Sequence, residues 1–205
     1  ISEGLFYGCT GLTRYKVPDW ITKVGKGAFY NCTKLQELTL PDTVTELGDY
    51  AFDCCTSLTG VELPAQITTL GAGLFYGCTG LTRYTVPHQI TAIGEGAFYG
   101  CTNLTEILIP DTVTSLGDFV FNGCTSLTGV RLPAKITAIG EGLFNGCTAM
   151  TRYDVPEQIT AIGDGAFYGC TSLAAITLPD TVAEIGANAF GITHIRSAGI
   201  SEANE

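Results

Sequence analysis

The chain has 205 residues, of which 45% are hydrophobic and only 15% are charged, and its formal net charge is −10. This acidic balance argues against nucleic acid as a general partner, because binding to phosphates needs a basic surface. The sequence has no run of about 18 apolar residues, so it predicts no membrane-spanning helix.

A motif of 23 residues recurs along the whole sequence. Its clearest marker is a phenylalanine, which returns at Phe6, Phe29, Phe52, Phe75, Phe98, Phe121, Phe144, Phe167 and Phe190. A short, fixed period is typical of a solenoid, in which each turn buries its apolar face against the neighbouring turns. We therefore expect a single solenoid over residues 1–205, with about nine turns.

The first turn begins with apolar residues at the repeat positions. Ile1, Leu5, Phe6 and Leu12 have no polar segment in front of them, and Trp20, the only tryptophan, belongs to the same turn. An apolar surface at the end of a solenoid favours association with another chain. Either residues precede Ile1 in a longer parent protein, or this end docks onto another chain. In the second case we predict self-association through these five residues.

A glycine-rich segment opens each turn, as in Gly94–Cys101. We predict that it forms a single helical or 3-10 turn on the back of the solenoid, because an acidic residue such as Glu95 near its start suits the positive end of a helix. The column of Gly100 is expected to leave this turn in a left-handed conformation. Asn31 and Cys54 stand in the same column, and Cys54 should be mildly strained there.

Eight of the nine cysteines recur once per turn, at Cys9, Cys32, Cys55, Cys78, Cys101, Cys124, Cys147 and Cys170. They lack the short paired spacings of metal sites, and they show none of the alternation that bridges between neighbouring turns would require. We interpret them as reduced, buried, small hydrophobic side chains. A serine in this column would then bury a hydroxyl without a partner. No metal ion or other cofactor is expected.

A short strand follows the glycine-rich segment. The alternation of Leu104, Ile107 and Ile109 predicts an inward-facing strand, and Pro110 ends it because proline cannot donate to a ladder. Stacked copies predict a parallel sheet with one strand per turn. The positions equivalent to Glu106 then face outward.

The repeat resembles the BspA-like, or Treponema-type, leucine-rich repeat family. The positions that carry the resemblance are Leu104, Ile107, Ile109, Pro110, Val113, Leu116 and Gly117, together with Ala97, Phe98 and Cys101. The resemblance covers nearly the whole chain and implies a leucine-rich repeat solenoid without catalytic residues. It also implies an extracellular or cell-surface location, because members are typically bacterial or protozoal surface proteins and often adhesins that bind host proteins or neighbouring cells.

A longer period is superimposed on the short one. Gly4–Tyr15 and Gly73–Tyr84 are identical over twelve residues, and Gly142–Tyr153 is a close copy. The sequence therefore predicts three units of three turns, at residues 1–69, 70–138 and 139–205. The tyrosine that ends each copy replaces an aliphatic strand residue, so its hydroxyl needs a partner.

The outward strand positions carry every arginine of the chain. We propose them as the ligand-binding face, with Arg14, Glu37, Glu62, Arg83, Glu106, Arg131, Arg152, Asp154 and Arg196 as candidate residues. Arginine is favoured at protein interfaces. Two alternatives stay open: the arginines are copies of one ancestor, and pairs such as Arg14 with Glu37 or Arg83 with Glu106 serve only solubility. Arg152 faces Ala175 and is expected to lack a partner.

An outward stripe of tyrosines on the back comprises Tyr7, Tyr30, Tyr76, Tyr99 and Tyr168. It is either a second contact surface or a row of rings that lie flat over the adjoining turns.

The last turn is degenerate. After Phe190 the Gly-Cys-Thr stretch is missing, and Ile192–Arg196 is expected to form a shortened strand that carries His194 and Arg196 on the outward face. Residues 186–205 therefore read as a closing turn, which solenoids need for solubility.

Catalysis finds no support, because the only histidines, His88 and His194, lie in unrelated columns without a serine or cysteine motif. The sequence favours a non-enzymatic protein-binding module, a cell-surface or secreted adhesin that binds a protein through its concave strand face. The alternatives are a structural subunit that stacks end to end into a filament or array, and a consensus-designed repeat scaffold.

Overall fold

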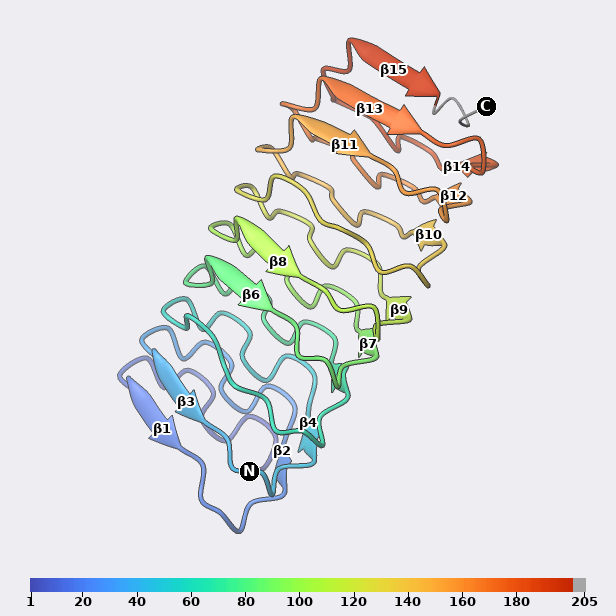
Figure 1. Cartoon of the computed structure of the whole chain (residues 1–205). Coiled ribbons are helices and arrows are strands. Elements are labelled where there is room, and N and C mark those ends of the chain that lie inside the picture. Colours follow the sequence, from blue (N-terminus) through green and yellow to red (C-terminus); the bar gives the residue numbers. More distant parts are fainter. Residues whose placement is uncertain (201–205) are drawn as a thin grey trace.

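The computed structural model describes residues 1–200 of the chain. The 23-residue units stack along one axis, so the two ends of the chain lie at opposite ends of an elongated solenoid (Figure 1). The predicted closing turn at residues 186–205 lies in part outside the described residues.

Short parallel strands run along one face of the solenoid, which we call the strand face (Figure 1). These are β1 (Arg14–Lys16), β3 (Glu37–Thr39), β6 (Arg83–Thr85), β8 (Glu106–Leu108), β11 (Arg152–Asp154), β13 (Ala175–Leu178) and β15 (Ser197–Ile200). In β3, β6, β8 and β11 the middle residue is buried and its two neighbours are exposed, as the alternating pattern predicts.

The ladder on the strand face is interrupted twice. β1 pairs with β3, β6 with β8, β11 with β13, and β13 with β15, while residues 59–62 and 128–131 form no strand. We call these two segments the first break and the second break. The expectation of one strand per turn is therefore wrong for these two turns.

Each break contains a glycine at an outward strand position, Gly60 or Gly129. Glycine weakens a strand because it loses more backbone entropy and offers no side chain for cross-strand packing. The turn that follows each break carries a tyrosine, Tyr84 or Tyr153, at the buried strand position. The hydroxyl of Tyr153 donates to the carbonyl oxygen of Val130, within the second break, at 3.0 Å.

A second parallel ladder runs along the return path of each turn, which the sequence analysis did not foresee. Its two-residue strands are β2 (Lys23–Val24), β4 (Glu46–Leu47), β5 (Thr69–Leu70), β7 (Ala92–Ile93), β9 (Ser115–Leu116), β10 (Ala138–Ile139), β12 (Ala161–Ile162) and β14 (Glu184–Ile185). They form the sheets β2-β4, β5-β7-β9 and β10-β12-β14.

The back of the solenoid consists of tight turns, so the predicted helical or 3-10 turn is wrong: residues 1–200 contain no helix. Alternate backbone N–H groups donate hydrogen bonds to the neighbouring turn instead of their own. Those of Gly27 and Phe29 donate to Asp49 and Ala51 of the next turn, both at 2.9 Å, whereas those of Ala28 and Tyr30 bond within their own turn. A helix cannot form because each back turn contains two residues in the left-handed conformation, four positions apart, such as Gly27 and Asn31.

The left-handed positions occupy two columns, and only one of them was predicted. Asn31 (φ 59°) and Cys54 (φ 56°) confirm the column of Gly100. The second column contains Gly27 and Gly96 but also Tyr50 (φ 57°) and Phe119 (φ 58°), where a bulky side chain stores strain of about 1 kcal/mol or more.

The core is a continuous stack of phenylalanine rings with aliphatic residues around it. Phe29, Phe52, Phe75, Phe98, Phe121, Phe144 and Phe167 are completely buried, and neighbouring rings in this run lie 5.3–6.1 Å apart. Phe6 and Phe190, in the terminal turns, are only partly buried. The structure thus supports about seven turns of parallel solenoid, and the expected nine are not supported.

Cys9 is only partly buried, so the predicted burial is wrong for this residue. From Cys32 to Cys170 the column is buried, as predicted, and its thiols are unbridged. Each of these thiols also has a polar role: the Sγ of Cys101 donates to the carbonyl oxygen of Phe75 in the preceding turn at 3.1 Å, and six other cysteines of the column repeat this contact. The column therefore joins successive turns by hydrogen bonds as well as by packing.

Candidate functional site

Two of the candidate arginines form the ion pairs that the register predicts. Arg14 Nε lies 3.3 Å from Glu37 Oε2 between β1 and β3, and Arg83 Nε lies 3.6 Å from Glu106 Oε2 between β6 and β8. All four side chains are more than half exposed, so each pair contributes less than about 1 kcal/mol to stability.

Arg152 is paired as well, so the expectation that it lacks a partner is wrong. Its Nη2 lies 3.0 Å from Asp154 Oδ1 on the same strand, β11. The same carboxylate accepts a hydrogen bond from the Thr177 hydroxyl at 2.8 Å. The hydrogen bonds from Arg152 and Thr177 lower the pKa of Asp154. Sequence reasoning missed this pair because it considered only the neighbouring strand.

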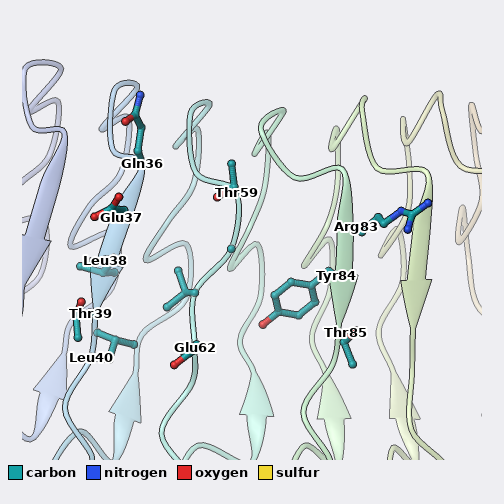
Figure 2. A pocket seen from close by; sticks show the side chains of 12 residues that line it. Gln36, Glu37, Leu38, Thr39, Leu40, Thr59, Glu62, Arg83, Tyr84 and Thr85 are labelled. Carbon is teal, nitrogen blue, oxygen red and sulfur yellow. The ribbon is translucent and has the colours of Figure 1, made fainter.

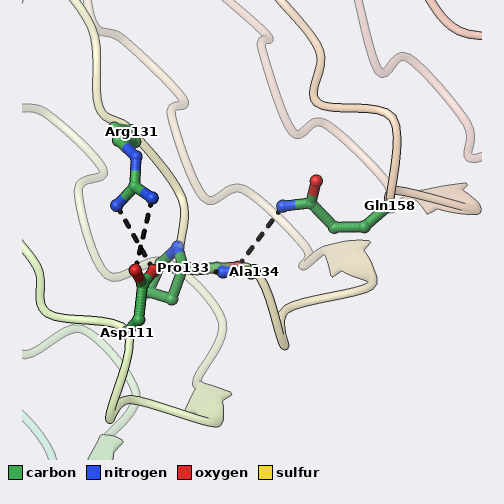
Figure 3. Close-up of polar contacts among 5 residues, drawn as sticks. All are labelled: Asp111, Arg131, Pro133, Ala134 and Gln158. Carbon is green, nitrogen blue, oxygen red and sulfur yellow. Dashed lines mark hydrogen bonds and ion pairs between the residues drawn. The ribbon is translucent and has the colours of Figure 1, made fainter.

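Arg131 closes the second break. Its Nη1 and Nη2 donate to the two carboxylate oxygens of Asp111, both at 3.3 Å (Figure 3). Asp111 belongs to the preceding turn, so this two-point ion pair connects the second break to the preceding turn, where no ladder hydrogen bonds do so. The hydrogen bond from Arg131 also lowers the pKa of Asp111.

Arg196 lies outside the columns of the strand face. β15 pairs with β13 so that Ser197 stands beside Ala175, and Arg196 precedes the strand. The N–H of Arg196 donates to the carbonyl of Ala174 at 2.9 Å, and His194 Nδ1 contacts the carbonyl of Thr171. The shortened strand expected at Ile192–Arg196 is therefore wrong: the strand lies at Ser197–Ile200, and Ser197 pairs with Ala175 22 residues away, one fewer than the 23-residue period.

The strand face is hollowed at the first break. A groove of about 480 Å³ lies between β3 and β6, with residues 59–62 at its centre (Figure 2). Its walls are formed by Gln36, Glu37, Leu38, Thr39 and Leu40 on one side and Arg83, Tyr84 and Thr85 on the other.

Tyr84, the buried middle residue of β6, points toward the segment that carries Glu62 (Figure 2). The residue is 8% exposed, and its hydroxyl oxygen is buried without a hydrogen-bond partner among the described residues. Burial raises the pKa of Tyr84, so its hydroxyl keeps its proton at neutral pH. The groove therefore contains an unused hydrogen-bond donor.

Glu62 and Arg83 are the other charged side chains nearest the break. Glu62 is exposed and forms no ion pair in the part of the chain that the structure describes. Arg83 points away from the break (Figure 2), and its Nε lies 3.6 Å from Glu106 Oε2 on β8. Of the candidate residues, the groove thus brings together Glu37, Glu62 and Arg83.

The tyrosine stripe on the back is organised in stacked pairs. The rings of Tyr7 and Tyr30 lie 5.0 Å apart at an interplanar angle of 5°, and those of Tyr76 and Tyr99 lie 4.5 Å apart at 3°. Between the pairs stands Asp53, which is only 6% exposed. The rings therefore cover each other along the solenoid axis.

The residues predicted for self-association differ in exposure. Trp20 is 80% exposed and Leu5 is 54% exposed, whereas Ile1, Phe6 and Leu12 are partly buried against the core.

The described residues hold no group of three or more His, Cys, Asp or Glu side chains that could bind a metal ion. Residues 1–200 also contain no helix of the length and apolarity that a membrane span would require.

Comparison with known proteins gives consistent matches to bacterial leucine-rich repeat structures. The leucine-rich repeat protein of T. pallidum is 30% identical with a TM-score of 0.70, and the match covers 78% of each chain. A leucine-rich cell surface protein from Faecalibacterium prausnitzii is 24% identical with a TM-score of 0.59, over 98% of this chain and 76% of that one.

The pneumococcal vaccine antigen PcpA shares the fold at 16% identity with a TM-score of 0.64, and the match covers 94% of this chain and 57% of that one. No curated protein matches the chain. The family model of the BspA type leucine rich repeat region matches residues 1–116 and 91–205, in six copies. The chain therefore belongs to the BspA-type leucine-rich repeat family.

Proposed function

We propose that the chain is a non-enzymatic protein-binding module that engages its ligand through the strand face, in the manner of a cell-surface or secreted adhesin. The observation that carries the proposal is the groove at the first break, with its buried and unpaired Tyr84 hydroxyl. Ligand sites are concave and contain a few convergent polar groups, and this groove has both properties. The surface location follows from what the family resemblance implies.

The ion pairs change which strand-face residues we expect to act. Arg14, Arg83, Arg131 and Arg152 are each held by a carboxylate of the chain itself. An acidic ligand would have to compete with these carboxylates. The open groove is therefore a better candidate for the contact than a row of free arginines.

The test compares two faces of the same solenoid. Peptides are selected from a random library on the wild-type chain, and their binding is then measured on Thr39→Arg and Thr85→Arg, which project a bulky side chain from β3 and β6. Thr114→Arg is the control, because Thr114 is exposed just before β9 in the other ladder. Loss of binding in the first two variants and not in the control supports the strand face, whereas loss only in the control contradicts it.

Self-association through the N-terminal turn stays a second candidate function. The observation in its favour is the exposure of Trp20 and Leu5 beside the partly buried Phe6. A large apolar surface of this kind is typical of an interaction site.

A further inference from the structure

We propose that the groove at the first break is a binding site for an extended polypeptide segment of a partner protein that carries a lysine or arginine side chain. This inference rests on the proposed function of the strand face and adds the place and the chemistry of the contact.

The chain contains its own comparison for this groove. The first and second breaks are equivalent positions of the 69-residue period, and a glutamine of the next turn bridges both in the same way. Gln89 Nε2 donates to the carbonyl of Pro64 at 3.5 Å, and Gln158 Nε2 donates to the carbonyl of the equivalent Pro133 at 3.4 Å (Figure 3 shows the second). The two breaks therefore share a backbone frame, and their side chains can be compared directly.

The first difference between the breaks is the tyrosine hydroxyl. At the second break, Tyr153 donates to the carbonyl of Val130 at 3.0 Å. At the first break, the hydroxyl of Tyr84 is equally buried but has no partner in the described residues. A buried donor without an acceptor is unfavourable, and such groups are rare in folded proteins. A ligand that supplies an acceptor would remove this penalty.

The second difference is the charge at the mouth. Arg131 and Asp111 form a two-point ion pair across the second break. The equivalent residues at the first break are Glu62 and Asp42, which are both acidic and cannot form such a pair. The second break is thus closed by the chain itself, and the first is left open with unpaired negative charge. A cationic side chain of a partner is the group that complements it.

The backbone around the groove favours a polypeptide as the occupant. β3 pairs only with β1, and β6 pairs only with β8, so each presents an unpaired edge toward the break. Residues 59–62 make no backbone hydrogen bond to either neighbouring turn within the described part of the chain. An extended peptide offers alternating N–H and C=O groups for such edges, and one of its carbonyls can accept from Tyr84.

The space above Gly60 is already open, whereas the Tyr84 hydroxyl is itself buried, so a peptide reaches this hydroxyl only when the groove residues around it shift. A Cβ atom placed on Gly60 would meet no heavy atom within 4 Å, so the floor of the groove is open. Glu37 and Glu62 lie on the rim, and the only basic residue among the lining residues, Arg83, is engaged by Glu106.

The experiment selects peptides from a random library on the immobilised wild-type chain and measures the affinity of the best binders by calorimetry. We expect enrichment of lysine and arginine. Glu62→Arg, which gives the first break the residue of the second, should weaken binding at least about tenfold, and Tyr84→Phe should weaken it about fivefold to tenfold.

The matched control is Tyr153→Phe, the same change as Tyr84→Phe but at the second break, and it should leave the affinity unchanged. Circular dichroism and thermal unfolding verify that each variant is folded. Weakening by Leu108→Arg on β8, an exposed strand-face residue outside the groove, without any effect of Glu62→Arg and Tyr84→Phe would leave the strand face as the binding surface and overturn this groove. Selection of acidic peptides, of none at all, or binding of a glycan in their place would also overturn it.

Discussion

At the residue scale, the repeated side chains do more than fill the core. The cysteines illustrate this: the sequence predicts small buried hydrophobes, and the structure adds a thiol hydrogen bond to the phenylalanine carbonyl of the preceding turn. Neither partner is visible in the sequence, because the two residues are 26 positions apart and the bond depends on how one turn lies over the next.

This geometry changes the expectation for serine in the column. Cys101→Ala should destabilise the chain by about 1 kcal/mol through lost packing and one lost hydrogen bond. Cys101→Ser should be no worse than alanine, because the carbonyl of Phe75 already stands 3.1 Å from the thiol. Urea unfolding measures both. Cys9→Ala is the control, since Cys9 is partly exposed and its thiol has no hydrogen bond within the described residues; a serine variant clearly less stable than the alanine variant would contradict this account.

A second residue-scale prediction concerns Asp53. Burial raises the pKa of its carboxyl group, with an opposing hydrogen bond from Cys54, and its Oδ1 atom has no partner in the described part of the chain. The folded state therefore binds this proton more tightly than the unfolded state. The contribution to stability is greatest below the ordinary pKa of about 3.9 and is lost as the pH rises through the raised value.

Asp53→Asn should therefore stabilise the chain at neutral pH and have less effect at a pH below about 3.9. Unfolding free energies at the two pH values measure the difference, with the exposed Asp19→Asn as control. An equal effect of Asp53→Asn at both pH values would show that ionisation of the Asp53 carboxyl group does not destabilise the folded state.

At the element scale, the sequence predicts the inward and outward alternation of the strands but not where the ladder stops. The signal was present, because Gly60 and Gly129 stand in an outward strand column and Tyr84 and Tyr153 in the buried column of the next turn. The return ladder has no such signal: a strand of two residues such as Ala92–Ile93 contains only one inward residue, which is too short for a periodic pattern.

The back turns show the same limit. The residues Gly96 and Gly100 are compatible both with a helix end and with two successive left-handed turns, and only the hydrogen bonds to the neighbouring turns decide between them. Of the ion pairs at the candidate site, those between paired strands could be predicted from the sequence, and the one at the second break could not. The register gives Arg14 with Glu37, whereas Asp111 lies beyond the proline that ends its strand and could not be placed beside Arg131.

The breaks yield an element-scale prediction. Gly129→Thr should stabilise the chain by about 0.5–1 kcal/mol, because a β-branched residue favours extended backbone and a Cβ atom there would meet nothing within 4 Å. Gly123→Thr is the matched control: Gly123 has a φ of 72°, so this change should destabilise. Chemical denaturation measures both, and destabilisation by Gly129→Thr would mean that the break is enforced by contacts other than the glycine.

At the scale of the whole molecule, the solenoid has a strand face with a groove, a tyrosine stripe on its back and an N-terminal turn with exposed apolar residues. The division into units at residues 1–69, 70–138 and 139–205 remains a prediction. The comparison between equivalent breaks relies only on residues 69 positions apart, and it shows how repeat copies can diverge in polar contacts while keeping their backbone.

The N-terminal turn gives a prediction about assembly. The weight-average mass measured by sedimentation equilibrium should rise with protein concentration. The double variant Trp20→Ser and Leu5→Ser should reduce this rise, because these two side chains are the most exposed of the predicted contact residues. Exposed Leu108→Ser on β8 is the control. A strict monomer at high concentration, with unchanged Trp20 fluorescence on dilution, would exclude self-association through this turn.

The central claim is that the first break on the strand face is the open binding site, and amide hydrogen exchange with and without a selected basic peptide tests it most directly. In the free chain, residues 59–62 and 128–131 should both exchange quickly, and β8 should exchange slowly, because β8 is held in a ladder and these two segments are not. With the peptide bound, protection should rise at residues 37–39, 59–62 and 83–85 and stay unchanged at 128–131. Protection confined to the tyrosine stripe on the back, or equal protection at both breaks, would contradict the claim that the first break is the binding site.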